Sequence, residues 1–97
     1  MGQLQECIDD LGSLVPELAG KIEEDDYQRI KGLHAYFKPR PAFLPSDFAI
    51  LTQHIKALNY FLQTSELYKT NEGSRKMLEL AIGTLERIAQ SEGGAQI

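Results

Sequence analysis

Apolar residues recur at steps of three and four along most of the chain, which is the spacing of one face of an α-helix. The first run extends from Leu4 to Leu18. Pro16 interrupts this run, because proline lacks an amide donor and its ring clashes with the preceding helical turn. The pattern therefore predicts a helix over about residues 2–14 and a continuation over about 16–23, either separate or merged through a bend.

A second helix is predicted from about Glu24 to Phe37. Asp25 or Asp26 is expected to accept hydrogen bonds from the free amides at its start, where acidic side chains also favour the helix dipole. Its end follows from Pro39, because residues that precede a proline avoid the helical conformation. The apolar stripe of this helix is Tyr27, Ile30, Leu33 and Phe37.

Residues 38–45 have the sequence KPRPAFLP and hold three of the chain's four prolines. Such a segment is predicted to form a stiff, extended connector with little conformational entropy left to lose on binding. Arginine and aromatic side chains are enriched at binding hot spots, so Lys38, Arg40 and Phe43 are candidate partner-binding residues. In the alternative interpretation, Phe43 and Leu44 pack under the following helix as a hydrophobic staple.

A third helix is predicted to begin with Ser46 or Asp47 as its cap. Its apolar arc is broad enough to predict a central helix with neighbours on several sides. The end of this helix stays open, because Thr64 and Ser65 weaken the pattern while residues 66–69 continue it. The apolar positions are Phe48, Ile50, Leu51, Ile55, Ala57, Leu58, Tyr60, Phe61 and Leu62.

A last helix is predicted to begin at Ser74 as its cap and to stop at Gly93 and Gly94. Leu80 lies outside its apolar stripe. The stripe itself consists of Met77, Leu78, Ala81, Ile82, Leu85, Ile88 and Ala89.

Together these segments predict an all-α fold: a compact bundle of four to five helices with antiparallel neighbours and one proline-rich connector. A chain of 97 residues, 42% of them hydrophobic, has room for one domain, which we place at residues 1–92 with a frayed tail at 93–97. The start of the chain has no cationic and then apolar run, and Cys7 is the one cysteine. These features favour a cytoplasmic protein without a membrane anchor.

Charge is distributed unevenly along the chain. Residues 1–26 hold eight acids and Lys21 alone, a net charge of −7, whereas residues 27–97 hold nine bases and six acids, a net charge of +3. Glu23, Glu24, Asp25 and Asp26 form the densest acidic cluster and are candidate residues for docking a basic partner. Helix-start electrostatics and solubility are the alternative explanation. Nucleic acid is an unlikely partner for an acidic chain without a basic stripe.

The sequence predicts no catalytic, cofactor or metal site. Cys7, His34 and His54 are the only soft metal ligands, and they lie on three different predicted helices without close spacing. Neither histidine has a recognisable nucleophile or orienting carboxylate beside it.

No motif assigns the chain to a family. Its size, acidity and helical plan resemble those of small bacterial immunity and inhibitor proteins, a similarity of fold and charge. We therefore expect a non-enzymatic protein-interaction module, a small binder, adaptor or inhibitor whose partner is another protein. The alternatives are a homo-oligomeric assembly component, such as a homodimer, and, less favoured, a small DNA-binding regulator.

Overall fold

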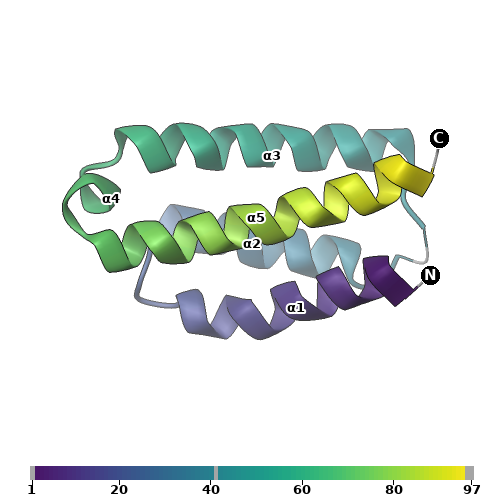
Figure 1. Cartoon of the computed structure of the whole chain (residues 1–97), viewed down its shortest axis with the longest axis horizontal. Coiled ribbons are helices and arrows are strands. Elements are labelled where there is room, and N and C mark those ends of the chain that lie inside the picture. Colours follow the sequence, from purple (N-terminus) through teal and green to yellow (C-terminus); the bar gives the residue numbers. More distant parts are fainter. Residues whose placement is uncertain (1, 41, 96–97) are drawn as a thin grey trace.

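The computed structural model describes residues 2–40 and 42–95, and this part of the chain contains five helices and no strand. The predicted all-α class is confirmed. Figure 1 shows the helices in chain order. They are α1 (Gly2–Leu18), α2 (Glu24–Phe37), α3 (Pro45–Thr64), α4 (Glu66–Thr70) and α5 (Glu72–Ala95).

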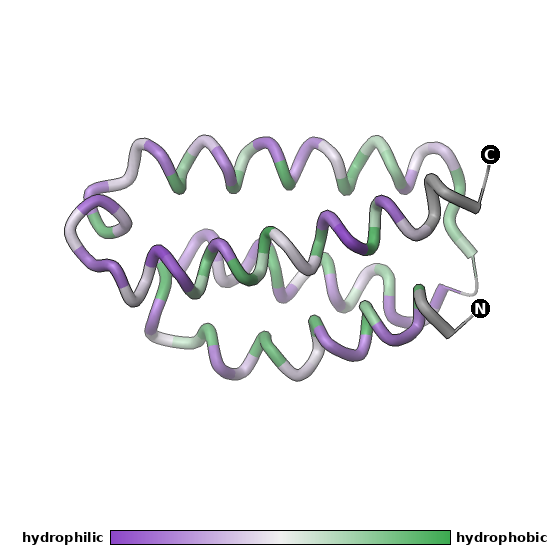
Figure 2. Tube along the Cα trace, in the orientation of Figure 1, coloured by the Kyte–Doolittle hydropathy of each residue, from purple (hydrophilic) through white to green (hydrophobic). Residues whose placement is uncertain are grey.

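Four long helices form the bundle, and each runs antiparallel to the next long helix along the chain (Figure 1). α1 contacts α2 and α5, and α3 contacts α5 more extensively than it contacts α2. The bundle measures 40 × 22 × 17 Å. Figure 2 shows apolar positions recurring at helical intervals along the long helices, with polar positions between them, as expected for helices that bury one face each.

α1 runs through Pro16 without a break and ends at Leu18. The merged alternative is therefore correct, whereas the predicted helical continuation to residue 23 is wrong. Residues 19–23 instead link α1 to α2, because Gly20 adopts a φ of 76°, a left-handed conformation that ends a helix and that glycine takes readily. Ile22 is buried and anchors the link to the core.

α2 begins at Glu24 and ends at Phe37, as predicted. The predicted cap by Asp25 or Asp26 is wrong, because Glu23 occupies the N-cap position and no side chain caps the helix. Asp26 lies on the inner side of the first turn, where its buried carboxylate accepts a hydrogen bond from the Tyr68 hydroxyl. The buried apolar residues of α2 are Ile30, Leu33 and Phe37.

The central helix of the bundle is α5, not α3. α3 does have neighbours on several sides, since it contacts α2, α4 and α5, but the apolar residues that it fully buries are Leu51 and Leu58, whereas α5 packs extensively against both α1 and α3. The sequence pattern misassigned the centre because the width of an apolar arc reports how much surface a helix offers, not how much its neighbours cover. The buried apolar residues of α5 are Leu78, Ala81, Ile82, Leu85 and Ile88.

The helices are interrupted twice in residues 65–71. The sequence left the end of α3 open, and it placed the start of α5 at Ser74. Ser65 adopts an extended conformation and separates α3 from the short helix α4. Asn71, not Ser74, caps α5, since its Oδ1 accepts the Ser74 amide at 3.0 Å. Asparagine is among the best N-cap residues, and its position three residues before Ser74 fits this bond.

α5 also extends further than predicted. It continues through Gly93 and Gly94 to Ala95, because glycine costs about 1 kcal/mol in a helix without forbidding it. Gln96 and Ile97, the end of the expected frayed tail, lie outside the described residues. Within residues 2–40 and 42–95, no helix is both long and apolar enough to cross a lipid bilayer.

Candidate functional site

The predicted acidic cluster divides into exposed and buried members at the start of α2. Glu23, Glu24 and Asp25 are exposed, whereas Asp26 retains only 2% of its accessible surface. A partner that docks on this surface therefore meets the first three carboxylates. Asp26 contributes to the bundle interior.

Tyr68 of α4 connects Asp26 to the α1–α2 link. Its hydroxyl donates to Asp26 Oδ2 at 2.6 Å and accepts the Glu23 amide at 3.0 Å. Ser65 Oγ adds a bond to Glu23 Oε2 at 2.8 Å. These contacts join segments more than forty residues apart and hold the start of α2 against α4.

Burial raises the pKa of Asp26 above its usual value, and the Tyr68 hydrogen bond and the Arg29 charge oppose this shift. The folded protein therefore binds the Asp26 proton more tightly than the unfolded chain does, whose aspartates have a pKa of about 3.9. The contribution of Asp26 to stability is consequently full below about pH 4 and declines as the pH rises through the folded-state pKa.

Asp26→Asn should remove this pH dependence. We expect the variant to gain stability relative to the wild-type protein as the pH rises from about 4 to about 7. Urea unfolding at several pH values gives the free energy of unfolding of both proteins. The other carboxylates titrate alike in the two proteins, so their effect cancels in the difference between the two free energies. A constant difference, or one with the opposite slope, contradicts the assignment.

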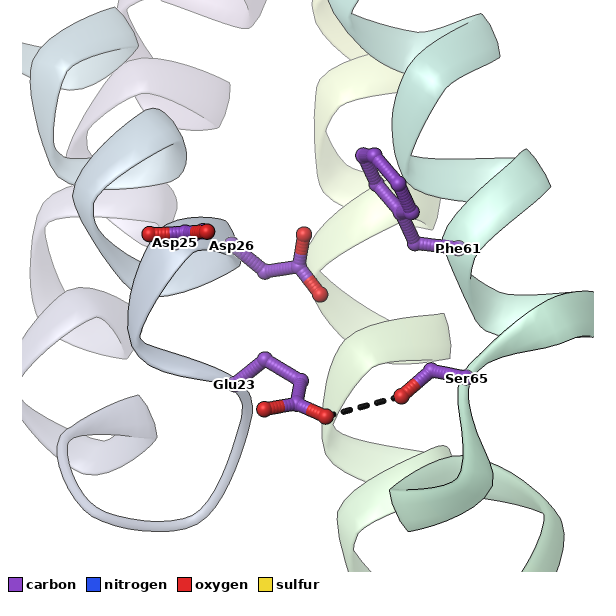
Figure 3. A pocket seen from close by; sticks show the side chains of 5 residues that line it. All are labelled: Glu23, Asp25, Asp26, Phe61 and Ser65. Carbon is purple, nitrogen blue, oxygen red and sulfur yellow. Dashed lines mark hydrogen bonds between the residues drawn. The ribbon is translucent and has the colours of Figure 1, made fainter.

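A small pocket lies between the start of α2 and the end of α3 (Figure 3). Its volume is about 120 Å³. Pockets for drug-sized ligands span roughly 300–1,000 Å³, so this one fits no more than a single side chain of a partner. The lining residues are Glu23, Asp25, Asp26, Phe61 and Ser65.

The proline-rich connector is packed against the bundle at Phe43, which retains 6% of its accessible surface. Its ring stacks on Phe37 at a centroid distance of 4.5 Å and meets the edge of Phe48 at 5.9 Å. Phe43 and Phe48 occupy the two positions of a hydrophobic staple around the N-cap of α3. Leu44 is exposed, so the packing that the alternative predicted for both residues holds for Phe43 alone.

Arg40 and Lys38 occupy different environments. The Arg40 guanidinium lies 4.1 Å from the centroid of the Tyr36 ring and 3.6 Å from Asp47 Oδ2. Lys38 is exposed. Of the three candidate residues of the connector, Phe43 and Arg40 therefore already make contacts within the bundle, whereas the Lys38 side chain is exposed to solvent.

Asp47, which retains 1% of its accessible surface, holds the connector in place. Its Oδ1 accepts the Tyr36 hydroxyl at 2.8 Å, and its Oδ2 accepts the Leu44 amide at 2.8 Å. The predicted cap by Ser46 or Asp47 is therefore wrong: Leu44 occupies the N-cap position of α3, and Asp47 lies at the third helical position, from which its carboxylate accepts the Leu44 amide. The Leu44 and Tyr36 hydrogen bonds lower the pKa of Asp47.

The soft ligands do not converge. Cys7 is buried in the core, His34 lies against Gly12 of α1, and His54 Nδ1 accepts Arg29 Nη1 at 2.8 Å. In residues 2–40 and 42–95, no group of three or more histidine, cysteine or acidic side chains is placed to hold a metal ion. Burial lowers the pKa of both histidines, and a nearby cation, Lys38 for His34 and Arg29 for His54, lowers it further.

All charged residues on the outer side of α1 are acidic. Glu6, Asp9, Asp10 and Glu17 are exposed there, and no basic residue lies on this helix. Arg87 of α5 forms an exposed ion pair with Asp10 at 3.3 Å. The link of residues 19–23 brings Glu17 and Glu24 to the same end of the bundle (Figure 1).

Comparison of the chain with protein-family models, with curated proteins and with solved structures found no match.

Proposed function

We propose that the protein is a non-enzymatic protein-interaction module, a small binder, adaptor or inhibitor that holds a basic partner. Its acidic surface consists of Glu6, Asp9, Asp10 and Glu17 of α1 with Glu24 and Asp25 of α2. The observation that carries the proposal is the outer side of α1, which presents four exposed carboxylates and no base of its own, one of them, Asp10, being paired with Arg87 of α5. Such a surface steers a basic partner and repels nucleic acid.

Two features of the bundle support a rigid surface of this kind. α1 is anchored through the buried side chains Ile8, Leu11 and Leu18, so its outer carboxylates project from a fixed helix. Tyr68 and Ser65 hold the start of α2 in place. A partner therefore meets a preorganised array of charges and loses less entropy on binding.

Neutralising three acids of α1 is expected to weaken partner binding without unfolding the protein. The partner would first be captured from an extract of the native cells on the immobilised wild-type chain and identified by mass spectrometry. We expect its association rate constant to fall about tenfold with the α1 variant and to fall with added salt. The α1 variant carries Glu6→Gln, Asp9→Asn and Glu17→Gln.

A control variant of equal net charge separates this surface from a general charge effect. It carries three exposed substitutions on α5, and we expect it to bind like the wild-type chain. If the partner binds both variants with the same rate constants as the wild-type chain, the acidic surface is not the binding surface. The control substitutions are Glu72→Gln, Glu79→Gln and Glu86→Gln.

A further inference from the structure

The first turn of α5 carries hydrogen-bond donors that the bundle leaves without acceptors. Asn71 Oδ1 accepts the Ser74 amide, but the amides of Glu72 and Gly73 have no acceptor in the part of the chain that the structure describes. α5 is also the longest helix of the bundle, with 24 residues, so its dipole places partial positive charge at this end. Both features favour an anion at the start of α5.

The Ser74 side chain is a second, independent feature of this place. Ser74 retains 7% of its accessible surface, yet its hydroxyl makes no hydrogen bond within residues 2–40 and 42–95, since the bond to Asn71 uses the Ser74 amide. Most buried hydroxyls in proteins have a partner, because a buried polar group without one costs about 1–3 kcal/mol. With Asn71 as the cap of α5, the fold leaves this hydroxyl unused, as is typical of a group that binds a ligand.

A cavity of about 410 Å³ lies where the start of α5 meets the α1–α2 link, at the end of the bundle that holds α4 (Figure 1). Ser74 lines this cavity, and Gly73 lines it with its backbone, because glycine has no side chain. Lys21 lines it from the link and is the one base among residues 1–26. The other lining residues are Gly20, Asn71 and Met77.

We propose that this cavity binds the phosphate group of an organic phosphomonoester. The Gly73 amide, the Ser74 hydroxyl and Asn71 Nδ2 donate to the phosphate oxygens, and the Lys21 ammonium group supplies the opposite charge. Asn71 Nδ2 is available because the cap of α5 uses Oδ1. A phosphomonoester has three terminal oxygens, which suit this number of donors better than the two oxygens of a carboxylate.

The cavity has room for more than the phosphate group. Pockets for small organic ligands span roughly 300–1,000 Å³, and the volume here lies within that range. Met77 is partly buried and provides an apolar wall for the organic part of the ligand.

The local charge suits an anion, although the chain as a whole is acidic. None of the residues that line the cavity is acidic, and Glu72 Oε2 lies 3.3 Å from Lys76 Nζ in an exposed ion pair. The net charge of −4 nevertheless weakens the binding of any anion, so we expect a dissociation constant of about 1 mM for a small phosphomonoester. The site uses no carboxylate of the acidic surface, so it does not depend on the proposed partner binding.

Nuclear magnetic resonance titration of the full chain with phenyl phosphate at constant ionic strength tests this proposal. The amide resonances of Gly73 and Ser74 should shift and saturate. Inorganic phosphate should shift the same resonances but bind about tenfold more weakly, because it lacks the contact with Met77. Sodium chloride at the same ionic strength should cause no saturable shift.

Three variants test the assigned residues. Ser74→Ala should raise the dissociation constant for phenyl phosphate about fivefold and leave urea unfolding unchanged, because the hydroxyl has no partner in the fold. Lys21→Gln should raise the dissociation constant by a similar factor. Lys56→Gln, at an exposed residue of α3, removes the same charge and should leave the dissociation constant unchanged.

The absence of a saturable shift at Gly73 and Ser74 would overturn the proposal. So would variants Ser74→Ala and Lys21→Gln that bind phenyl phosphate like the wild-type chain, or a Lys56→Gln variant that binds as weakly as Lys21→Gln. A Ser74→Ala protein that is less stable in urea would show that the hydroxyl serves the fold instead. Equal affinities for phenyl phosphate and inorganic phosphate would overturn the organic ligand.

Discussion

Replacing Asp47 with alanine should lower the equilibrium constant for folding about a hundredfold, because the buried carboxylate has three partners. The Leu44 amide and the Tyr36 hydroxyl both lose their acceptor, and Arg40 loses its counter-ion. The connector and the start of α3 are then held mainly by Phe43. Urea unfolding followed by circular dichroism at neutral pH measures the change.

Asp10→Ala is the matched control for Asp47→Ala. Asp10 also pairs with an arginine, Arg87, but both side chains are more than half exposed. Exposed ion pairs contribute little, so we expect less than a twofold change in the folding constant. A loss of equal size in the two variants would show that the Asp47 contacts do not anchor the connector.

The pH dependence of Asp47 has the opposite sign to that of Asp26. Because the pKa of Asp47 is lowered in the folded protein, its contribution to stability is present above about pH 4, the unfolded-state value. This contribution is lost as the pH falls through the folded-state pKa. The two carboxylates thus make opposing contributions between the acidic and the neutral range.

Tyr68→Phe should lower the free energy of unfolding by about 2 kcal/mol, although the substitution removes one oxygen atom. The ring stays in the core, while the Asp26 carboxylate loses its donor and the Glu23 amide loses its acceptor. Tyr60→Phe, at an exposed tyrosine, provides the control and should change stability by less than about 0.5 kcal/mol.

Amide hydrogen exchange gives a second measurement for Tyr68→Phe. The Glu23 amide should exchange faster in the variant, because its acceptor is the Tyr68 hydroxyl. Amides in the middle of α5 should exchange only through global unfolding in both proteins, so their exchange reports the overall stability. If Tyr68→Phe and Tyr60→Phe have the same stability, the hydroxyl does not hold the start of α2.

Helix positions were predictable from the sequence because they depend on local periodicity. The start of α2 at Glu24 was predicted from the acidic run, although the cap expected there is absent, and its end at Phe37 was predicted from Pro39. The errors lie where a local signal competes with another contact. Pro16 stays inside α1 because the apolar stripe continues to Leu18, and Asn71 caps α5 because its amide side chain reaches the third helical amide.

The candidate site was only partly predictable, because burial depends on residues distant in sequence. Asp25 and Asp26 are identical neighbours in an acidic run, yet one is exposed and the other is bound by Tyr68, 42 residues later. No spacing rule connects those positions. Asp47 did carry a signal, since a carboxylate three residues after a helix start can accept the N-cap amide, which is its contact here.

The position of α5 at the centre of the bundle determines when this chain can fold during its synthesis. α1, α3 and α4 all contact α5, whereas α2 contacts α3 only weakly. A nascent chain that ends before residue 72 therefore has amphipathic helices and no completed core to bury them. The ribosome must release the last of the five helices before a stable bundle exists, so folding follows the emergence of α5 rather than proceeding helix by helix.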